Sequence, residues 1–231
     1  MLKPTVKALI VGTPLEPIAK RVLDLIRREK VVEFTTSGEY WEKRYAQSGN
    51  SGAGSYGQLA TYKAEVLNDF VKQNAVRTVI EFGSGDGHQL TLAHYPNYVG
   101  VDVSQTAVAA CRKLFAGDAG KTFITLSDYE GQTADLALSL DVIYHLVEDK
   151  TFADYMERLF DSATRFVIVY SSNKSDQHEA KHVRHRKFTD WVDANREDFV
   201  LKSHIPNKFP YDASDPRNTS FADFFIYERS T

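Results

Sequence analysis

The feature that most restricts the fold is an alternation of strand-like and helix-like segments that begins at Thr78. Short apolar runs are separated by stretches whose apolar residues recur at helical spacing, a pattern typical of parallel βαβ units in a doubly wound α/β sheet. The last two strand-like runs have no helix between them, so they are free to pair antiparallel at one edge. We expect strands at 78–82, 97–103, 121–126, 134–140, 165–172, 200–205 and 220–228, and helices at 87–95, 104–115 (capped by Ser104), 151–160 and 188–198.

Residues 1–75 form a second, more helical part of the sequence. The run 18–30 has apolar residues at helical spacing with basic residues between them, which predicts an amphipathic helix. Residues 39–57 begin as an aromatic, charged half-helix and continue as a loop of Gly, Ser and Asn, and a second helix is expected at 59–74. We expect 1–75 to be a helical, lid-like extension packed on a core of residues 76–231, in one compact domain.

The composition is that of an ordinary soluble globular protein, with 42% hydrophobic and 26% charged residues. Lys and Arg number 28 and Asp and Glu number 31, so the net charge is −3, which argues against a basic face for nucleic-acid backbones. Cys111 is the one cysteine, so no disulfide forms within the chain. No apolar run reaches the roughly 18 residues that a membrane span requires, and we expect a cytoplasmic protein.

A glycine-rich turn, VIEFGSGDGHQL (79–90), follows the first expected strand. Glycines there let the backbone turn tightly and approach a ligand without a Cβ in the way. A dinucleotide-binding loop would have its third glycine where this chain has His88, and Glu81 stands two residues before Gly83. Since an acid beside a pyrophosphate repels it, the turn points away from a dinucleotide such as NAD and toward a positively charged nucleoside.

Two further acids follow the next two expected strands. Asp102 ends the second strand, where a carboxylate accepts hydrogen bonds from both hydroxyls of a ribose. Asp128 follows the third strand, in a position suited to an adenine amino group. Together with Glu81, these acids stand at three successive strand ends, where ligands bind in open α/β sheets.

Residues 78–170 resemble the class I S-adenosylmethionine-dependent methyltransferases. IEFGSGDG is similar to the first motif of that family, GVDVS to the second, LSDY to the third and DLALSLDVIYHLVED to the fourth. YWEKRY, which starts at Tyr40, is similar to the lid segment before the first motif. The resemblance implies an enzyme that uses S-adenosylmethionine and releases S-adenosylhomocysteine, a Rossmann-like sheet of seven mostly parallel strands with a reversed last strand, and no metal.

The resemblance also implies which residues hold the cofactor. Glu81 and the glycines would flank its methionine end, and Asp102 would bind its ribose. Asp128 and Tyr129 would contact its adenine, and Leu140 would lie on the sulfonium side. The full implied set is Tyr40, Tyr45, Glu81, Gly83, Ser84, Gly85, Gly87, Asp102, Val103, Asp128, Tyr129, Leu140 and Asp141.

Aromatic residues and an arginine gather ahead of the glycine-rich turn. They can close over the donor, because an aromatic ring attracts a sulfonium by about 0.5–2 kcal/mol through cation–π interaction. The alternative is a helix that packs an aromatic stripe on the sheet. The residues are Tyr40, Trp41, Arg44, Tyr45 and Tyr56.

Methyl transfer to an alcohol benefits from a general base with a pKa near neutrality, most often a histidine. His145 comes just after the fourth expected strand, which places it above the expected methyl donor. A histidine at a helix start that only hydrogen-bonds to the backbone fits the same position.

A second histidine cluster lies in residues 171–191, where His178, His182 and His185 could share one helix face. A metal site is one interpretation, disfavoured because no acid or cysteine ligand set accompanies the histidines. An anion-binding face for a phosphate or carboxylate on the acceptor is another, and a solvated charged loop a third. We retain His145, His182 and His185 as candidate bases or acceptor anchors.

A looser resemblance concerns the acceptor. HVRHRKFTDW, IPNKFPYD, TSFADFFIYE and LIVGTPLEPIAKRV are similar to methyltransferases of bacterial surface-glycan gene clusters, which implies a sugar or sugar-linked phosphate acceptor in polysaccharide biosynthesis. The loop 207–221 can line the acceptor pocket or be a plain connection. We expect O-methylation of a small, polar, sugar-related molecule. N-methylation of a small metabolite and a non-catalytic nucleoside-binding scaffold remain open. A nucleic-acid acceptor is disfavoured, since the fourth motif lacks Asn or Asp followed by Pro-Pro-Tyr.

Overall fold

The computed structural model describes residues 32–176 and 180–230. The chain divides into two units, Met1–Glu33 and Phe34–Thr231, and every helix and strand given below lies in the second unit. The helix expected at 18–30 lies outside the described residues. Ahead of the sheet, the expected half-helix and the helix that follows it are α3 (Ser37–Ala46) and α4 (Gly57–Gln73).

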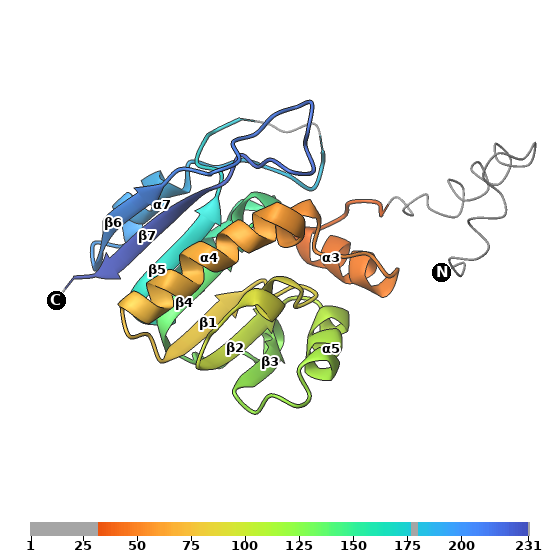
Figure 1. Cartoon of the computed structure of the whole chain (residues 1–231). Coiled ribbons are helices and arrows are strands. Elements are labelled where there is room, and N and C mark those ends of the chain that lie inside the picture. The colour runs from red at the N-terminus through yellow and green to blue at the C-terminus, as the bar shows by residue number, and fades with distance from the viewer. Residues whose placement is uncertain (1–31, 177–179, 231) are drawn as a thin grey trace, which may run out of the picture. The chain divides into compact units, whose positions relative to one another are not determined.

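The sheet has seven strands in the order β3-β2-β1-β4-β5-β7-β6 (Figure 1). Strands β1 to β5 pair in parallel, whereas β7 is antiparallel to both β5 and β6. This confirms the doubly wound, mostly parallel sheet with an antiparallel last strand. The strands are β1 Thr78–Phe82, β2 Asn97–Asp102, β3 Lys121–Thr125, β4 Ala134–Leu140, β5 Ala163–Ser171, β6 Phe199–Ile205 and β7 Asp223–Arg229.

Helices cover both faces of the sheet. α4 and α5 (Gln105–Leu114) contribute residues such as Leu67 to one apolar cluster, and α4 runs across that face in Figure 1. α6 (Asp149–Asp161) and α7 (Phe188–Asn195) contribute residues such as Met156 to a second cluster on the other face. Successive residues of β4 and β5 alternate between the two clusters, as expected for strands buried on both sides.

The start of α5 follows the expected pattern. Ser104 is its N-cap, and its hydroxyl oxygen accepts a hydrogen bond from the Ala107 N–H at 3.1 Å. The same hydroxyl donates to Glu42 of α3 at 2.6 Å, so α3 is tied to the start of α5. None of the helices in the described part of the chain is both long and apolar enough to cross a membrane.

The expectation of a helix at 87–95 is wrong, because that segment contains only a 3₁₀ turn at Gln89–Leu92. The Asn68 side chain on α4 takes over the backbone groups that a longer helix would use. It donates to the Leu92 carbonyl at 3.0 Å and accepts from the His94 N–H at 2.8 Å. These tertiary hydrogen bonds override a weak local helical pattern.

Candidate functional site

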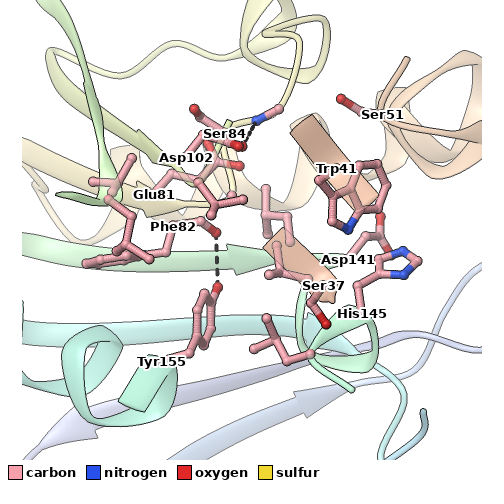
Figure 2. A pocket seen from close by; sticks show the side chains of 18 of the residues that line it. Ser37, Trp41, Ser51, Glu81, Phe82, Ser84, Asp102, Asp141, His145 and Tyr155 are labelled. Atoms are coloured by element: carbon pink, nitrogen blue, oxygen red, sulfur yellow. Dashed lines mark hydrogen bonds between the residues drawn. The ribbon is translucent and has the colours of Figure 1, made fainter. Parts of the chain in front are cut away.

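A cavity of about 440 Å³ lies at the carboxyl ends of β1, β2 and β4, and residues of α3 and α6 complete its walls. Figure 2 shows Glu81 and Asp102 on one side of it and Trp41 and His145 on the other. This edge is where ligands bind in open α/β sheets. The predicted site residues that line the cavity are Tyr45, Glu81, Gly83, Ser84, Gly85, Asp102, Val103, Leu140, Asp141 and His145.

The glycine-rich turn forms one wall, and at two of its positions the backbone conformation requires glycine. Gly83 and Gly85 have φ angles of +86° and +58°, in the left-handed region that glycine adopts without steric cost. A Cβ on Gly83 would collide with Val142, and a Cβ on Gly85 would collide with the Ser51 hydroxyl. The turn can therefore lie directly against its neighbours while its backbone faces the cavity.

Asp102 is buried at the end of β2, beside the glycine-rich turn. Its carboxylate accepts hydrogen bonds from the N–H groups of Gly85 and Ser104, both at 2.8 Å. Burial raises the pKa of Asp102 to about 6, although the two N–H donors lower it. The carboxylate is thus fixed at the cavity wall and is mostly ionised at neutral pH.

Glu81 is the second buried acid of the wall. It accepts a hydrogen bond from the Tyr98 hydroxyl at 2.7 Å. Burial raises the pKa of Glu81 to about 7, while Tyr98 and the nearby Lys63 ammonium lower it. A cationic group placed in the cavity would favour the ionised form of this carboxyl group.

A buried ion pair joins α4 to the end of β4, and its lysine was not among the residues predicted from the sequence. The Lys63 ammonium lies 2.6 Å from the Asp141 carboxylate, and its side chain is 1% exposed. The Tyr144 hydroxyl donates to the other Asp141 oxygen at 2.9 Å. Asp141 has a φ of +60°, a conformation that costs a residue other than glycine about 1–3 kcal/mol and that clusters at functional sites.

The loop after α3 is docked on the glycine-rich turn through Asp86. Its carboxylate accepts hydrogen bonds from the Ser51 N–H and the Tyr56 hydroxyl, both at 2.8 Å. Although burial acts to raise it, the pKa of Asp86 is below its ordinary value because N–H and O–H donors surround the carboxylate. The sequence offered one indication that Asp86 would hold this loop, namely its position inside the glycine-rich motif.

Aromatic rings form the end of the cavity opposite Asp102 (Figure 2). Trp41 packs edge-on against His145, with ring centroids 4.9 Å apart. His145 stacks on His182 at 5.6 Å, and His182 stacks on Tyr40 at 4.5 Å. This row of rings brings α3, the end of β4 and the histidine cluster together.

His145 ends the short turn Ile143–His145 that follows β4. Its Nδ1 lies 3.0 Å from the main-chain oxygen of His182. Because a carbonyl only accepts, the ring proton is on Nδ1 and the lone pair is on Nε2. Burial lowers the pKa of His145 to about 4, so the ring is neutral at physiological pH. His145 therefore hydrogen-bonds to the backbone and also lines the cavity.

Residues 180–187, called the basic strap below, do not form a helix, so the expectation of a shared helix face for His182 and His185 is wrong. Arg184 and Arg186 of the strap each donate to the Val147 carbonyl at 2.9 Å. These side-chain hydrogen bonds compete with a local helix and hold the strap against the turn that carries His145.

His185 is buried, and its Nδ1 lies 2.7 Å from the Ser172 hydroxyl. Neither His185 nor His182 is among the described residues that line the cavity, and His178 lies outside the described residues. Within the described ranges, no group of three His, Cys, Asp or Glu side chains could hold a metal ion.

Other predicted residues lie near the cavity without lining it. Asp128 is exposed and accepts a hydrogen bond from the Thr125 hydroxyl at 2.7 Å, and the neighbouring Leu126 lines the wall. Tyr129 donates to the Gln132 carbonyl at 3.1 Å. The predicted residues outside the lining are Tyr40, Gly87, Asp128, Tyr129, His182 and His185.

Sequence reasoning also missed residues that do line the cavity. Tyr155 of α6 has its hydroxyl 3.0 Å from the Phe82 carbonyl, a hydrogen bond drawn in Figure 2. Gln89 was missed as well, whereas its neighbour in the wall, Ser84, was predicted. The side-chain oxygens of both are buried and have no hydrogen-bond partner among the described residues. A ligand in the cavity could satisfy both.

Residues 80–168 match the family model described as a methyltransferase domain. This segment is thus similar to a methyltransferase domain, and the fold of the chain is the Rossmann-like fold of S-adenosylmethionine-dependent methyltransferases. No curated protein sequence matches the sequence of this chain. The matched residues run from β1 to β5 and include Glu81, Asp102, Asp141 and His145.

Solved structures of methyltransferases share the fold of this chain. Magnesium protoporphyrin IX methyltransferase from Synechocystis PCC 6803, with bound S-adenosylmethionine, is 16% identical with a TM-score of 0.60, over 85% of this chain and 99% of that one. The N-methyltransferase NodS from Bradyrhizobium japonicum WM9, with S-adenosylhomocysteine, is 12% identical with a TM-score of 0.66, over 85% and 100%. The methyltransferase domain of bacterial CtHen1-C is 18% identical with a TM-score of 0.58, over 74% and 98%.

S-adenosylmethionine is the cofactor of this family, and the cavity fits it. The sulfonium and ammonium groups of this cofactor are positive and its carboxylate is negative, and the cavity wall offers Glu81, Asp102 and Asp141 together with Lys63. The unsatisfied oxygens of Ser84 and Gln89 lie in the same wall. Both the charges and the polar groups of the site thus complement the cofactor.

Proposed function

We propose that the chain transfers a methyl group from S-adenosylmethionine to a hydroxyl, or to a phosphate-linked oxygen, of a small polar acceptor related to a sugar. The observation that carries the proposal is the placement of His145, which lines a cavity that fits the cofactor and whose neutral ring has its lone pair on Nε2. The sugar-related acceptor rests on the looser sequence resemblance given above.

In this proposal Asp102 accepts hydrogen bonds from the ribose, and the glycine-rich turn lies along the nucleoside. Glu81 and Asp141 face the ammonium of the methionine end, and Lys63 faces its carboxylate. Val103, Leu126 and Leu140 line the wall as apolar neighbours, and Asp128 and Tyr129 complete the adenine end from outside the lining. Gly87 acts indirectly, because a Cβ there would lie 3.0 Å from Cys111 and Phe115, so glycine lets α5 pack close to the turn.

When bound, S-adenosylmethionine supplies an activated methyl carbon whose bond to sulfur breaks as the acceptor oxygen bonds to it, leaving a neutral thioether. Nε2 of His145 takes the hydroxyl proton in the same step, and the ring becomes an imidazolium. The His182 carbonyl holds the ring in the required tautomer through Nδ1. His182 then acts as a positioning residue, and His185 supports the strap through Ser172.

The N-terminal part has a separate task in this proposal. α3 and the loop to Tyr56 close the cavity as a lid, with Trp41 and Tyr45 in its lining and Arg44 holding the loop through the Asn50 carbonyl at 2.8 Å. A closed lid excludes water from the activated methyl group and orients the acceptor.

The test replaces His145 with Asn in the full-length chain. An asparagine amide can still donate to the His182 carbonyl but cannot take a proton at neutral pH. We expect turnover on a panel of sugars and sugar phosphates, followed as S-adenosylhomocysteine release, to fall by about 100-fold or more. Binding of S-adenosylhomocysteine should remain within threefold of wild type, about 0.7 kcal/mol.

The matched control is His94→Asn, because His94 is an exposed histidine outside the cavity lining. It should leave both turnover and binding unchanged. Equal turnover in His145→Asn and wild type on a hydroxyl acceptor would contradict the role of His145. Cofactor binding without turnover on any acceptor would instead support a nucleoside-binding scaffold.

N-methylation of a small metabolite is the second candidate, and the pKa of His145 favours it. A ring with a pKa of about 4 is a weak base, whereas a neutral amine carries its own lone pair and needs little help from a base. Under this alternative, His145→Asn methylates an amine acceptor at nearly the wild-type rate. The same variant therefore separates the two candidates.

A further inference from the structure

A second cavity, of about 130 Å³, lies beside the first. Its walls come from the loop before α4, from the segment after β4 and from the loop between β6 and β7. Residues from these three segments include Gly54, Tyr144 and Phe221. Segments far apart in the sequence therefore meet to enclose it.

Asp141 lines both cavities, so the two cavities are neighbours. In the sheet order, Asp102 ends β2, Asp141 ends β4, and the β6–β7 loop lies beyond β5. A cofactor whose ribose is at Asp102 and whose methionine end reaches Asp141 leaves the β7 side open for the acceptor. The second cavity occupies that side.

The walls of the second cavity combine aromatic rings with a few oxygens. Tyr144 packs against Phe221 edge-to-face, with centroids 5.2 Å apart, and Tyr211 lies 5.8 Å from Phe221. Apart from the tyrosines, Thr219, Ser220 and Asp141 are the polar side chains that line this cavity among the described residues. Aromatic faces with a few placed polar groups suit a ring that is apolar on its faces and hydroxylated at its rim.

The charge of the second cavity excludes one class of ligand. Among the described residues that line it, Asp141 is the charged one, and none is Lys, Arg or His. The Lys63 ammonium that pairs with Asp141 belongs to the lining of the first cavity. Among the described lining residues, a phosphate or carboxylate would therefore meet an acid and no cation. The Lys174 ammonium lies outside this lining, 5.7 Å from the centroid of the Phe221 ring.

We propose that the second cavity binds the ring that carries the methyl-accepting group, and that this ring is an uncharged or cationic sugar rather than one with a phosphate or carboxylate on it. The proposal rests on the proposed function and adds the charge and size of the acceptor ring. The volume is near the roughly 150 Å³ of a cavity that takes up benzene, which allows one six-membered ring.

The test titrates three probes into the full-length protein saturated with S-adenosylhomocysteine, with NMR chemical shifts as the readout. The probes are D-glucosamine, methyl α-D-glucoside and D-glucose 6-phosphate. We expect the two sugars without phosphate to bind at least tenfold more tightly than the phosphate. Each titration is repeated without S-adenosylhomocysteine, so that a failure to bind the cofactor is detected separately.

Two variants assign the binding to the second cavity. Ala53→Leu extends a side chain from an exposed wall position, and Phe221→Leu removes a ring. Each should weaken sugar binding at least tenfold while the affinity for S-adenosylhomocysteine stays within threefold. The control is Ala119→Leu, the same substitution as Ala53→Leu at an exposed position outside both cavities, which should change neither.

Three results would overturn this inference. The first is sugar binding that neither Ala53→Leu nor Phe221→Leu weakens. The second is binding of D-glucose 6-phosphate as tight as that of the other probes. The third is a protein that binds S-adenosylhomocysteine but none of the sugars. Sugar binding with no binding of S-adenosylhomocysteine would instead reject the proposed function and leave the cavity as a sugar site.

Discussion

The Nδ1 atom of His145 lies 3.0 Å from the main-chain oxygen of His182, a residue 37 positions later in the chain. This contact fixes the proton on Nδ1 and leaves the lone pair on Nε2 of a ring that lines the first cavity. Two arginines of the basic strap hold the strap on the turn that carries His145. The strap is thus connected to the candidate base through the backbone.

The first prediction concerns Arg186, which donates to the Val147 carbonyl at 2.9 Å and to Asp149 at 2.6 Å. Arg186→Met keeps the apolar length of the side chain but loses these hydrogen bonds. We expect kcat to fall about tenfold, or 1.4 kcal/mol, with KM for S-adenosylmethionine unchanged. The ¹⁵N spectrum of His145 should change from a single Nδ1–H tautomer to a mixture.

The control for Arg186 is Lys187→Met, at the next residue. Lys187 is half exposed and pairs with Asp190 on its own segment, so its loss should change neither kcat nor the spectrum. A fall in kcat with an unchanged His145 tautomer would show that Arg186 acts on the fold in general and not through His145.

The second prediction is a pH dependence of stability that originates at Glu81. Its pKa in the folded protein, about 7, is above its ordinary value of 4.5, so the fold favours the protonated form. The stabilisation is fully present below pH 4.5 and is lost as the pH rises to about 7.

Glu81→Gln removes this titration and can keep an acceptor for the Tyr98 hydroxyl. We expect the variant to match wild type in free energy of unfolding near pH 4 and to exceed it at pH 8 by a difference on the order of 3 kcal/mol. Urea unfolding at both pH values measures the difference. The same variant should bind S-adenosylhomocysteine more weakly, and a stability difference independent of pH would contradict the assignment.

The third prediction compares two glycines with the same φ angle of +58°, Gly85 and Gly57. An alanine at either position costs about 1–2 kcal/mol for the left-handed backbone. A Cβ on Gly57 meets nothing within 4 Å, whereas a Cβ on Gly85 meets the hydroxyls of Ser51 and Tyr45.

Gly85→Ala should therefore lower the affinity for S-adenosylhomocysteine at least tenfold, because Ser51 and Tyr45 both line the cavity. Gly57→Ala should lower stability by a similar amount and leave the affinity unchanged. Calorimetric titration, together with thermal unfolding, measures both quantities. Equal loss of affinity in the two variants would attribute the effect to backbone strain alone.

The strands and their order of appearance could be predicted because buried strands depend on short-range patterns. Residues 134–140 read as a strand, and β4 has those bounds. The helix at 87–95 could not be excluded from sequence, because the competing hydrogen bonds come from Asn68 on α4. A local pattern does not reveal that its backbone groups are satisfied by a distant side chain.

Some residues of the candidate site could likewise be predicted from the sequence, and others could not. Glu81 and Asp102 could be located because each ends or nearly ends a predicted strand, and both line the cavity. Lys63 could not, since a lysine among apolar positions of a helix ordinarily reaches solvent. Its partner Asp141 is 78 residues away, and only the fold brings the two charges together.

The central claim is that Asp102 and the glycine-rich turn hold S-adenosylmethionine, and calorimetric titration of S-adenosylhomocysteine tests it most directly. Wild type should bind at micromolar affinity, and Asp102→Ala should lose about 1.5–3 kcal/mol, tenfold or more. Asp102→Asn keeps an acceptor oxygen for the Gly85 N–H and is included in case Asp102→Ala does not fold. Asp69→Ala is the control, at an exposed acid outside the cavity.

The account predicts weakened binding in both Asp102 variants and unchanged binding in Asp69→Ala, with intact circular dichroism throughout. A folded wild-type protein that does not bind S-adenosylhomocysteine, or an Asp102→Ala variant that binds it as tightly as wild type, would contradict the account.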